Sequence, residues 1–296
     1  MNNDTAFDAF AEAEGTDDSR WAFGTGFADP LSGVDTTVPS GVDGAVLARY
    51  CLMLADDALV FSHRLQQWCT NAPELEDEMA LANIALDLLG QARLLLTRAG
   101  KADGSDRGED HYAYFRPEHE FLNVRLAELE RGDFGQLVAV LLVFSTFRLA
   151  LLNQLRSSVD PVLAAIAAKG VKEVTYHRDY AAGWAVRLGD GTAYSHERMQ
   201  AGLDAVWPYV AELFDPHETE LAMAAQGIGV DPSTVREEFD TVLAQVLAAA
   251  TLTVPGVAPK AALGGRAGRD GRHTEAMGYL LAELQSVART YPEATW

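Results

Sequence analysis

The chain is poor in cysteine and in positive charge. Its 296 residues include two cysteines, and 23 lysines and arginines stand against 43 acids, for a formal net charge of −20. Nucleic acids and anionic membranes bind clustered cations, so this balance argues against both as partners. Two thiols without a disulfide framework suit a reducing compartment. The first 20 residues are acidic, unlike a signal peptide. We therefore expect a cytoplasmic protein.

Long apolar runs and strand-like alternation are also missing. No run of 18 apolar residues occurs, so no transmembrane span is expected. No segment alternates polar and apolar residues as a half-buried strand does. Apolar residues recur instead at helical spacing, and hydrophobic residues make up 48% of the chain, enough for a sizeable core. The sequence predicts an all-α fold.

Four long helices are predicted, over residues 43–70, 73–99, 134–158 and 161–188. They are expected to form a four-helix bundle with shorter helices around it. The second is apolar on nearly every face apart from one thin polar line, formed by Glu76, Asn83, Asp87 and Gln91. A helix that is apolar all round is normally buried, so this helix is expected at the centre of the bundle.

Residues 1–42 precede the predicted helical domain of residues 43–296. They are acidic, rich in Gly, Ser, Thr and Asp, and interrupted by Pro30 and Pro39. This composition predicts a flexible extension. An alternative interpretation, that parts of it pack along the body or on a partner, is favoured by its aromatic residues, Phe7, Phe10, Trp21, Phe23 and Phe27.

A four-helix bundle with acids midway along its helices raises the question of a di-iron carboxylate site. Such a site takes one carboxylate from each of two helices and a Glu-x-x-His pair from each of the other two. Here Asp87 is followed three residues later by Gly90, and Glu173 by Tyr176. His177 comes one residue too late and is rotated by about 100°. The pattern predicts a degenerate site that binds no iron.

The first and third long helices complete this vestigial site. The first offers Asp56 or Asp57, but the third has no acid between Asp133 and Asp160 and carries Arg148 in an apolar stretch. A buried cation needs compensation. We expect Arg148 to pair with Asp87, Glu173 or Asp57, supplying the positive charge that iron would supply in an active relative. In the alternative, Arg148 lies at a helix edge and reaches solvent.

A glycine-rich loop over residues 253–272 carries four cations, Lys260, Arg266, Arg269 and Arg272. Such a loop running into a helix N-terminus can hold phosphate. The four cations are therefore candidate contacts for the phosphates of coenzyme A or for a partner. The alternative is a flexible connection that becomes ordered only on a partner.

Four segments resemble one family. Residues 62–93 (SHRLQQWCTNAPELEDEMALANIALDLLGQAR), 167–192, 211–218 and 271–285 are similar to the PaaC family, the C subunits of bacterial phenylacetyl-CoA epoxidases. The resemblance covers about residues 43–296, and residues 1–42 depart from it. It implies a ferritin-like fold.

The resemblance also implies a function. A PaaC-like protein is expected to be a structural, non-catalytic member of a heteromeric monooxygenase that epoxidises phenylacetyl-CoA in aerobic phenylacetate catabolism. Its partner would be the catalytic, PaaA-like protein, which carries the di-iron centre. Other subunits, including the reductase, could also make contact. Phenylacetyl-CoA would meet this chain only through the complex, and the chain itself would bind no cofactor.

Two alternatives remain from the residues. The first is a ferritin-like metal-dependent oxygenase or oxidase with an unorthodox site built from Asp57, Asp87, Glu173 and His177. The second is a helical interaction module unrelated to oxygenation. Metal analysis distinguishes an oxygenase with its own metal site from a structural subunit. Co-purification with a di-iron partner distinguishes a structural subunit from an unrelated interaction module.

Overall fold

The computed structural model describes residues 31–105, 107–262 and 267–294, and all regular structure in these ranges is helical. The α-helices are α1 (Gly44–Gln66), α2 (Leu75–Ala102), α3 (Glu109–Tyr114), α4 (Phe134–Leu155), α5 (Pro161–Gly189), α6 (Ala193–Val206), α7 (Glu218–Ala225), α8 (Arg236–Ala249) and α9 (Glu275–Thr290). Short 3-10 turns connect them, at η3 (Glu118–Glu120), η4 (Arg125–Glu128), η5 (Trp207–Tyr209), η6 (Ala211–Phe214), η7 (Pro232–Val235) and η8 (Gly268–Asp270).

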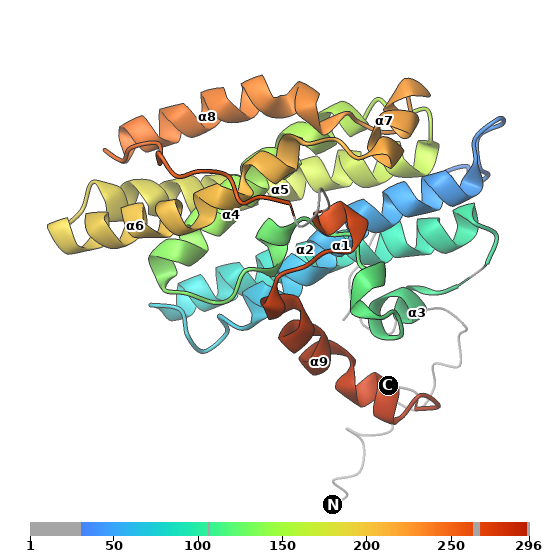
Figure 1. Cartoon of the computed structure of the whole chain (residues 1–296), viewed down its shortest axis with the longest axis horizontal. Helices are drawn as coiled ribbons and strands as arrows, with labels where there is room; N and C mark the ends of the chain where they lie inside the picture. Colours follow the sequence, from blue (N-terminus) through green and yellow to red (C-terminus); the bar gives the residue numbers. More distant parts are fainter. Residues whose placement is uncertain (1–30, 106, 263–266, 295–296) are drawn as a thin grey trace, which may run out of the picture.

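The four long helices form the predicted bundle. α1 packs along α2, α4 packs along α5, and α2 also contacts α5. α6 and α8 cover α4, and α7 lies against α1. Figure 1 shows α6 and α8 layered on one side of the bundle, with α9 and α3 at the opposite side. The all-α prediction and the ferritin-like arrangement of four long helices with peripheral ones are confirmed.

The innermost helix is α4 and not α2, so the expected position of α2 is wrong. The most apolar 18 residues of α4 are 94% buried, whereas those of α2 are 50% buried. Three large apolar side chains of α2 face outward, with Leu75 67%, Met79 60% and Leu86 60% exposed. Helices that are apolar on nearly all faces therefore differ in burial in this protein. In α4 every face meets the core, and in α2 one face has no described element over it.

Helix starts follow the capping residues only in part. Asp160 caps α5, because its carboxylate accepts hydrogen bonds from the backbone N–H groups of Val162 and Leu163. α2 begins at Leu75, later than the expected start at residue 73, and Glu74 occupies its capping position without a side-chain hydrogen bond. Pro73 therefore lies before the helix.

The helix that amphipathic spacing suggests over residues 117–130 is replaced by the two 3-10 turns η3 and η4. Two adjacent carboxylates of α1 account for this difference. Asp56 accepts a hydrogen bond from the backbone N–H of Leu122 at 2.9 Å, and Asp57 accepts one from that of Val124 at 2.8 Å. These N–H groups cannot also continue an α-helical ladder, so the segment crosses α1 in an extended conformation.

Residues 31–42 lie against the bundle. Their apolar side chains pack on the core, and Arg98 of α2 donates hydrogen bonds to the carbonyl oxygens of Thr36 and Thr37. The same guanidinium forms a buried ion pair with Asp160. This part of the N-terminal segment thus follows the body of the protein. Residues 1–30, with their five aromatic side chains, lie outside the described residues.

Candidate functional site

A chain of polar side chains crosses the interior of the bundle from α4 through α2 to α5. Arg148 Nε donates to Gln91 Oε1 at 2.9 Å, and Gln91 Nε2 donates to Glu173 Oε2 at 2.8 Å. Glu173 also forms an ion pair with Lys169, one turn earlier on α5. We call these three central residues the Arg148–Gln91–Glu173 chain. It joins a deeply buried cation to a carboxylate near the surface through one neutral amide.

Arg148 is buried, so the alternative in which it reaches solvent is wrong. Its residue is 3% exposed, Nη1 donates to the carbonyl oxygen of Leu54 at 3.3 Å, and Nη2 has no hydrogen-bond partner. Burial lowers the pKa of Arg148 to about 10, although the charges of Asp57 and Glu173 act to raise it. The compensation is therefore indirect. Glu173, one of the three expected partners, is reached through Gln91.

Asp87 and His177 contact one another across the α2–α5 boundary. His177 Nε2 lies 3.0 Å from Asp87 Oδ2. The imidazole is 1% exposed and the carboxylate side chain 37% exposed. Tyr176, at the position where the di-iron pattern needs histidine, is 51% exposed and points away from the interior. The offset of one residue turns His177, and not Tyr176, toward α2.

These residues do not fit a di-iron centre. Such a centre needs several carboxylate and imidazole donors converging on one point. Here Asp87 and His177 bind each other, Glu173 is held by Gln91 and Lys169, and a guanidinium lies on α4. No group of three or more His, Cys, Asp or Glu side chains among the described residues is placed to hold a metal ion. The unorthodox site considered from the sequence is not assembled either, because Asp57 is engaged elsewhere.

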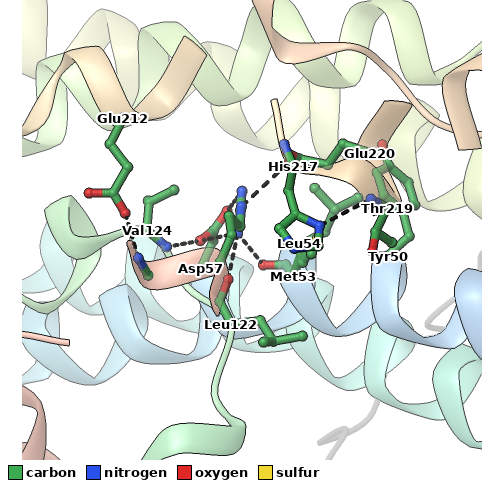
Figure 2. Close-up of polar contacts among 12 residues, drawn as sticks. Tyr50, Met53, Leu54, Asp57, Leu122, Val124, Glu212, His217, Thr219 and Glu220 are labelled. Carbon is green, nitrogen blue, oxygen red and sulfur yellow. Dashed lines mark hydrogen bonds and ion pairs between the residues drawn. The ribbon is translucent and has the colours of Figure 1, made fainter. Parts of the chain in front are cut away.

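Asp57 belongs to a second buried network, which ties the C-terminal part of the chain to α1. Figure 2 shows its carboxylate at the centre of this network. Arg269 of η8 binds Asp57 in a bidentate manner, with Nη1–Oδ1 and Nη2–Oδ2 both at 2.9 Å. Nη1 also donates to the carbonyl oxygens of Met53 and Leu122, and Nε lies 3.4 Å from Glu220 of α7.

This network excludes one predicted role. Burial alone would lower the pKa of Arg269, but Asp57 and Glu220 raise it above its ordinary value. Every nitrogen of the guanidinium is engaged inside the protein, so the prediction that Arg269 contacts a phosphate is wrong. Lys260 donates to the Tyr209 hydroxyl at 3.1 Å, and Arg272 is exposed. Arg266 lies outside the described residues.

Two further buried ion pairs were missed by the reasoning from sequence. Arg116 binds Asp56, the neighbour of Asp57. His273 binds Glu128, and both side chains are fully buried. Two adjacent acids in the apolar middle of a helix were the available signal, since a buried carboxylate requires a partner. The sequence alone did not identify the partner of each acid, because the partners lie on segments that are distant in the chain.

Comparison with known proteins gives one consistent result. The family model described as "Phenylacetic acid catabolic protein" (PaaA_PaaC) matches residues 35–296. The chain is also 42% identical over 250 residues to the C subunit of the 1,2-phenylacetyl-CoA epoxidase of Escherichia coli (strain K12). That match spans 84% of this chain and 99% of the relative.

Proposed function

Because the chain belongs to the phenylacetic acid catabolic protein family, we propose that it is a structural, non-catalytic subunit of a phenylacetyl-CoA epoxidase complex. Its likeness to the Escherichia coli epoxidase protein extends over 99% of that relative. The observation that carries the proposal is the Arg148–Gln91–Glu173 chain, in which α4 contributes a guanidinium, whereas each of the four helices of a di-iron bundle contributes a carboxylate.

The charge of Arg148 supports the part of the proposal in which this bundle holds no iron. The carboxylates facing the interior of a di-iron protein repel one another unless a cation lies between them. In this chain a guanidinium supplies a positive charge inside the bundle, and Gln91 links it to Glu173 by hydrogen bonds. The chain accordingly binds no iron and performs no oxidation alone. Its role is to hold a catalytic, PaaA-like di-iron protein, which acts on phenylacetyl-CoA within a cytoplasmic complex that also includes a reductase.

Co-expression with the PaaA-like protein of the same organism tests the proposal. We expect the two chains to co-purify, the complex to epoxidise phenylacetyl-CoA when the reductase is present, and activity to fall sharply when this chain is left out. Metal analysis of each purified chain after loading with ferrous iron is the companion measurement. About two irons bound per molecule of this chain alone would contradict the proposal. So would undiminished epoxidation in its absence.

A further inference from the structure

Asp77, in the first turn of α2, binds two oxidisable aromatic side chains of α5. Tyr180 Oη donates to Asp77 Oδ1 at 2.8 Å, and Trp184 Nε1 donates to the same oxygen at 2.9 Å. The two rings are four residues apart, so they lie on one side of α5. Asp77 itself is buried, with 6% of the residue exposed. We call these three residues the Asp77–Tyr180–Trp184 group.

The carboxylate of this group is placed to accept a proton. A base must lie within hydrogen-bond reach of the proton that it takes, and Asp77 lies within reach of both donors. Burial and the hydrogen bond to Asp77 raise the pKa of Tyr180 above its ordinary value. The phenol therefore stays protonated at neutral pH. It releases its proton only after losing an electron, because an oxidised phenol is a strong acid.

The charge beside the indole favours Tyr180 as the end point of an oxidation. The guanidinium of Arg187 lies 5.3 Å from the centroid of the Trp184 ring. This fixed positive charge opposes a second positive charge on the indole. An oxidised Tyr180, in contrast, becomes neutral once its proton has moved to Asp77. An electron is therefore expected to pass from Tyr180 to an oxidised Trp184, and not in the opposite direction.

Packing holds the two rings in place without enclosing them. Trp184 meets Phe134 of α4 edge to face, with ring centroids 5.0 Å apart. Tyr180 and Trp184 are both half-buried. A small oxidant can therefore approach their exposed edges, while the hydrogen bonds to Asp77 keep the donors in a fixed geometry.

We propose that the Asp77–Tyr180–Trp184 group is a redox site, at which a one-electron oxidation of this chain ends as a neutral tyrosyl radical on Tyr180. The oxidant is a small oxygen-derived radical, which takes one electron from the Trp184 indole and is reduced to its anion. Tyr180 then gives one electron to the indole, and its phenolic proton moves to Asp77 Oδ1. The products are the reduced oxidant, an intact Trp184, a protonated Asp77 and the tyrosyl radical, so electrons, protons and charge balance.

Flash photolysis of the full-length chain tests this site. The probe is tris(bipyridine)ruthenium(III), generated by light and persulfate at neutral pH. Transient absorption follows the indole radical, and electron paramagnetic resonance of frozen samples follows the tyrosyl radical. We expect Tyr180→Phe to lose most of the tyrosyl signal and Trp184→Phe to delay its appearance. Tyr176→Phe is the control, because it removes a 51% exposed tyrosine of the same helix that lies outside the group, and it should retain the wild-type signal.

Asp77→Asn tests the proton transfer. The amide oxygen still accepts hydrogen bonds but does not take the proton, so we expect decay of the indole radical to slow by roughly 100-fold, a usual contribution of a positioned proton acceptor. The slower reaction in heavy water that proton transfer causes in the wild type should also disappear. Circular dichroism verifies that each variant is folded. An unchanged tyrosyl signal in folded Y180F, or wild-type kinetics in folded D77N, would overturn the proposal, and Y180F decides alone if D77N does not fold.

Discussion

At the scale of single residues, the buried ionic groups fall into two kinds. Asp57 and Arg269, Asp56 and Arg116, and Asp160 and Arg98 form direct pairs, in which each charge is neutralised by its neighbour. Arg148 differs, because its hydrogen bonds go to an amide and a carbonyl oxygen. A buried cation without a directly bound carboxylate destabilises the folded state, which lowers the free energy of unfolding. Substitution of Arg148 therefore measures how much its burial lowers the free energy of unfolding.

Replacing Arg148 with methionine should stabilise the protein. The lowering of the Arg148 pKa from its ordinary value to about 10 means that the folded state disfavours the charged guanidinium. That shift corresponds to about 3 kcal/mol. Arg148→Met retains most of the side-chain volume and removes the charge, so we expect the free energy of unfolding in urea to rise by about 1–3 kcal/mol. A loss of similar size would show instead that Arg148 is compensated well enough to stabilise the bundle.

His273 should make stability depend on pH above neutrality. Nδ1 lies 2.9 Å from Glu128 and Nε2 lies 3.0 Å from the carbonyl oxygen of Phe121, so both nitrogens meet acceptors and the protonated ring satisfies both. Burial alone would lower the pKa of His273, but Glu128 raises it above its ordinary value. The stabilisation is therefore complete below the unfolded pKa of about 6.5 and is lost as pH rises through the folded pKa.

Urea unfolding of His273→Gln measures this effect. At pH 6 we expect the variant to be less stable than the wild type by about 3 kcal/mol, the usual effect of breaking a buried pair, and the difference to shrink by pH 9. His119→Gln, at an exposed histidine, is the control and should change stability by less than about 0.5 kcal/mol. A difference that does not vary with pH would refute the assignment of a charged His273.

At the scale of elements, α1 organises segments that are remote in the chain. Asp56 binds Arg116, which follows α3, and the adjacent Asp57 binds Arg269 of η8. They also accept backbone hydrogen bonds from the crossing segment at Leu122 and Val124. Because these contacts join α1 to the turn that precedes α9, the docking of α9 depends on α1.

Two arginines of the same loop provide a matched pair of variants. Arg269→Met leaves Asp57 buried without its partner, so we expect a loss of about 3–5 kcal/mol in the free energy of unfolding. Amide hydrogen exchange in α9 should accelerate as well, because η8 loses its anchor. Arg272→Met, at an exposed position, should stay within about 0.5 kcal/mol of the wild type. Equal behaviour of the two variants would remove the anchoring role of Arg269.

The spacing of apolar residues was sufficient to predict where the long helices lie in the sequence. It was insufficient to predict what each helix packs against. The periodicity of residues 134–158 and the Asp160-Pro161 start predicted α4 and α5 nearly to their ends, because both signals lie within one element. The prediction that α2 lies at the centre of the bundle was wrong, because apolar composition alone did not show that one side of the helix is exposed. Asp87, His177 and Arg148 were singled out from the sequence, and in the structure Asp87 lies beside His177 while Arg148 donates to Gln91. Gln91 was recognised as polar but not as the bridge, because that role depends on three helices meeting.

At the scale of the whole molecule, the buried residues that the structure describes account for none of the excess of acids. Among the described residues six acids and six arginines are buried, so these charges balance. The net charge of −20 is therefore carried by the remaining residues. Such a surplus destabilises the compact state through repulsion between surface charges, and salt screens that repulsion.

Thermal stability should consequently rise with ionic strength. Between 10 and 300 mM salt we expect Tm to increase by roughly 3–5 °C, with sodium and potassium chloride giving the same curve because screening does not distinguish the cations. Differential scanning calorimetry at pH 7 measures it. A decrease in Tm would indicate that exposed ion pairs, such as that of Arg236 with Asp240, outweigh the repulsion.

The bidentate pair of Asp57 with Arg269 also sets an order of events during synthesis. The two residues are separated by 212 positions. At a translation rate of ~5–20 residues per second, Arg269 is synthesised about 10–40 s after Asp57. During that time burial of its carboxylate is opposed by the loss of hydration. α1 therefore becomes fully enclosed only after Arg269 has been synthesised, and a chain cut short before Arg269 retains a hydrated, incompletely closed bundle that cellular proteases can recognise.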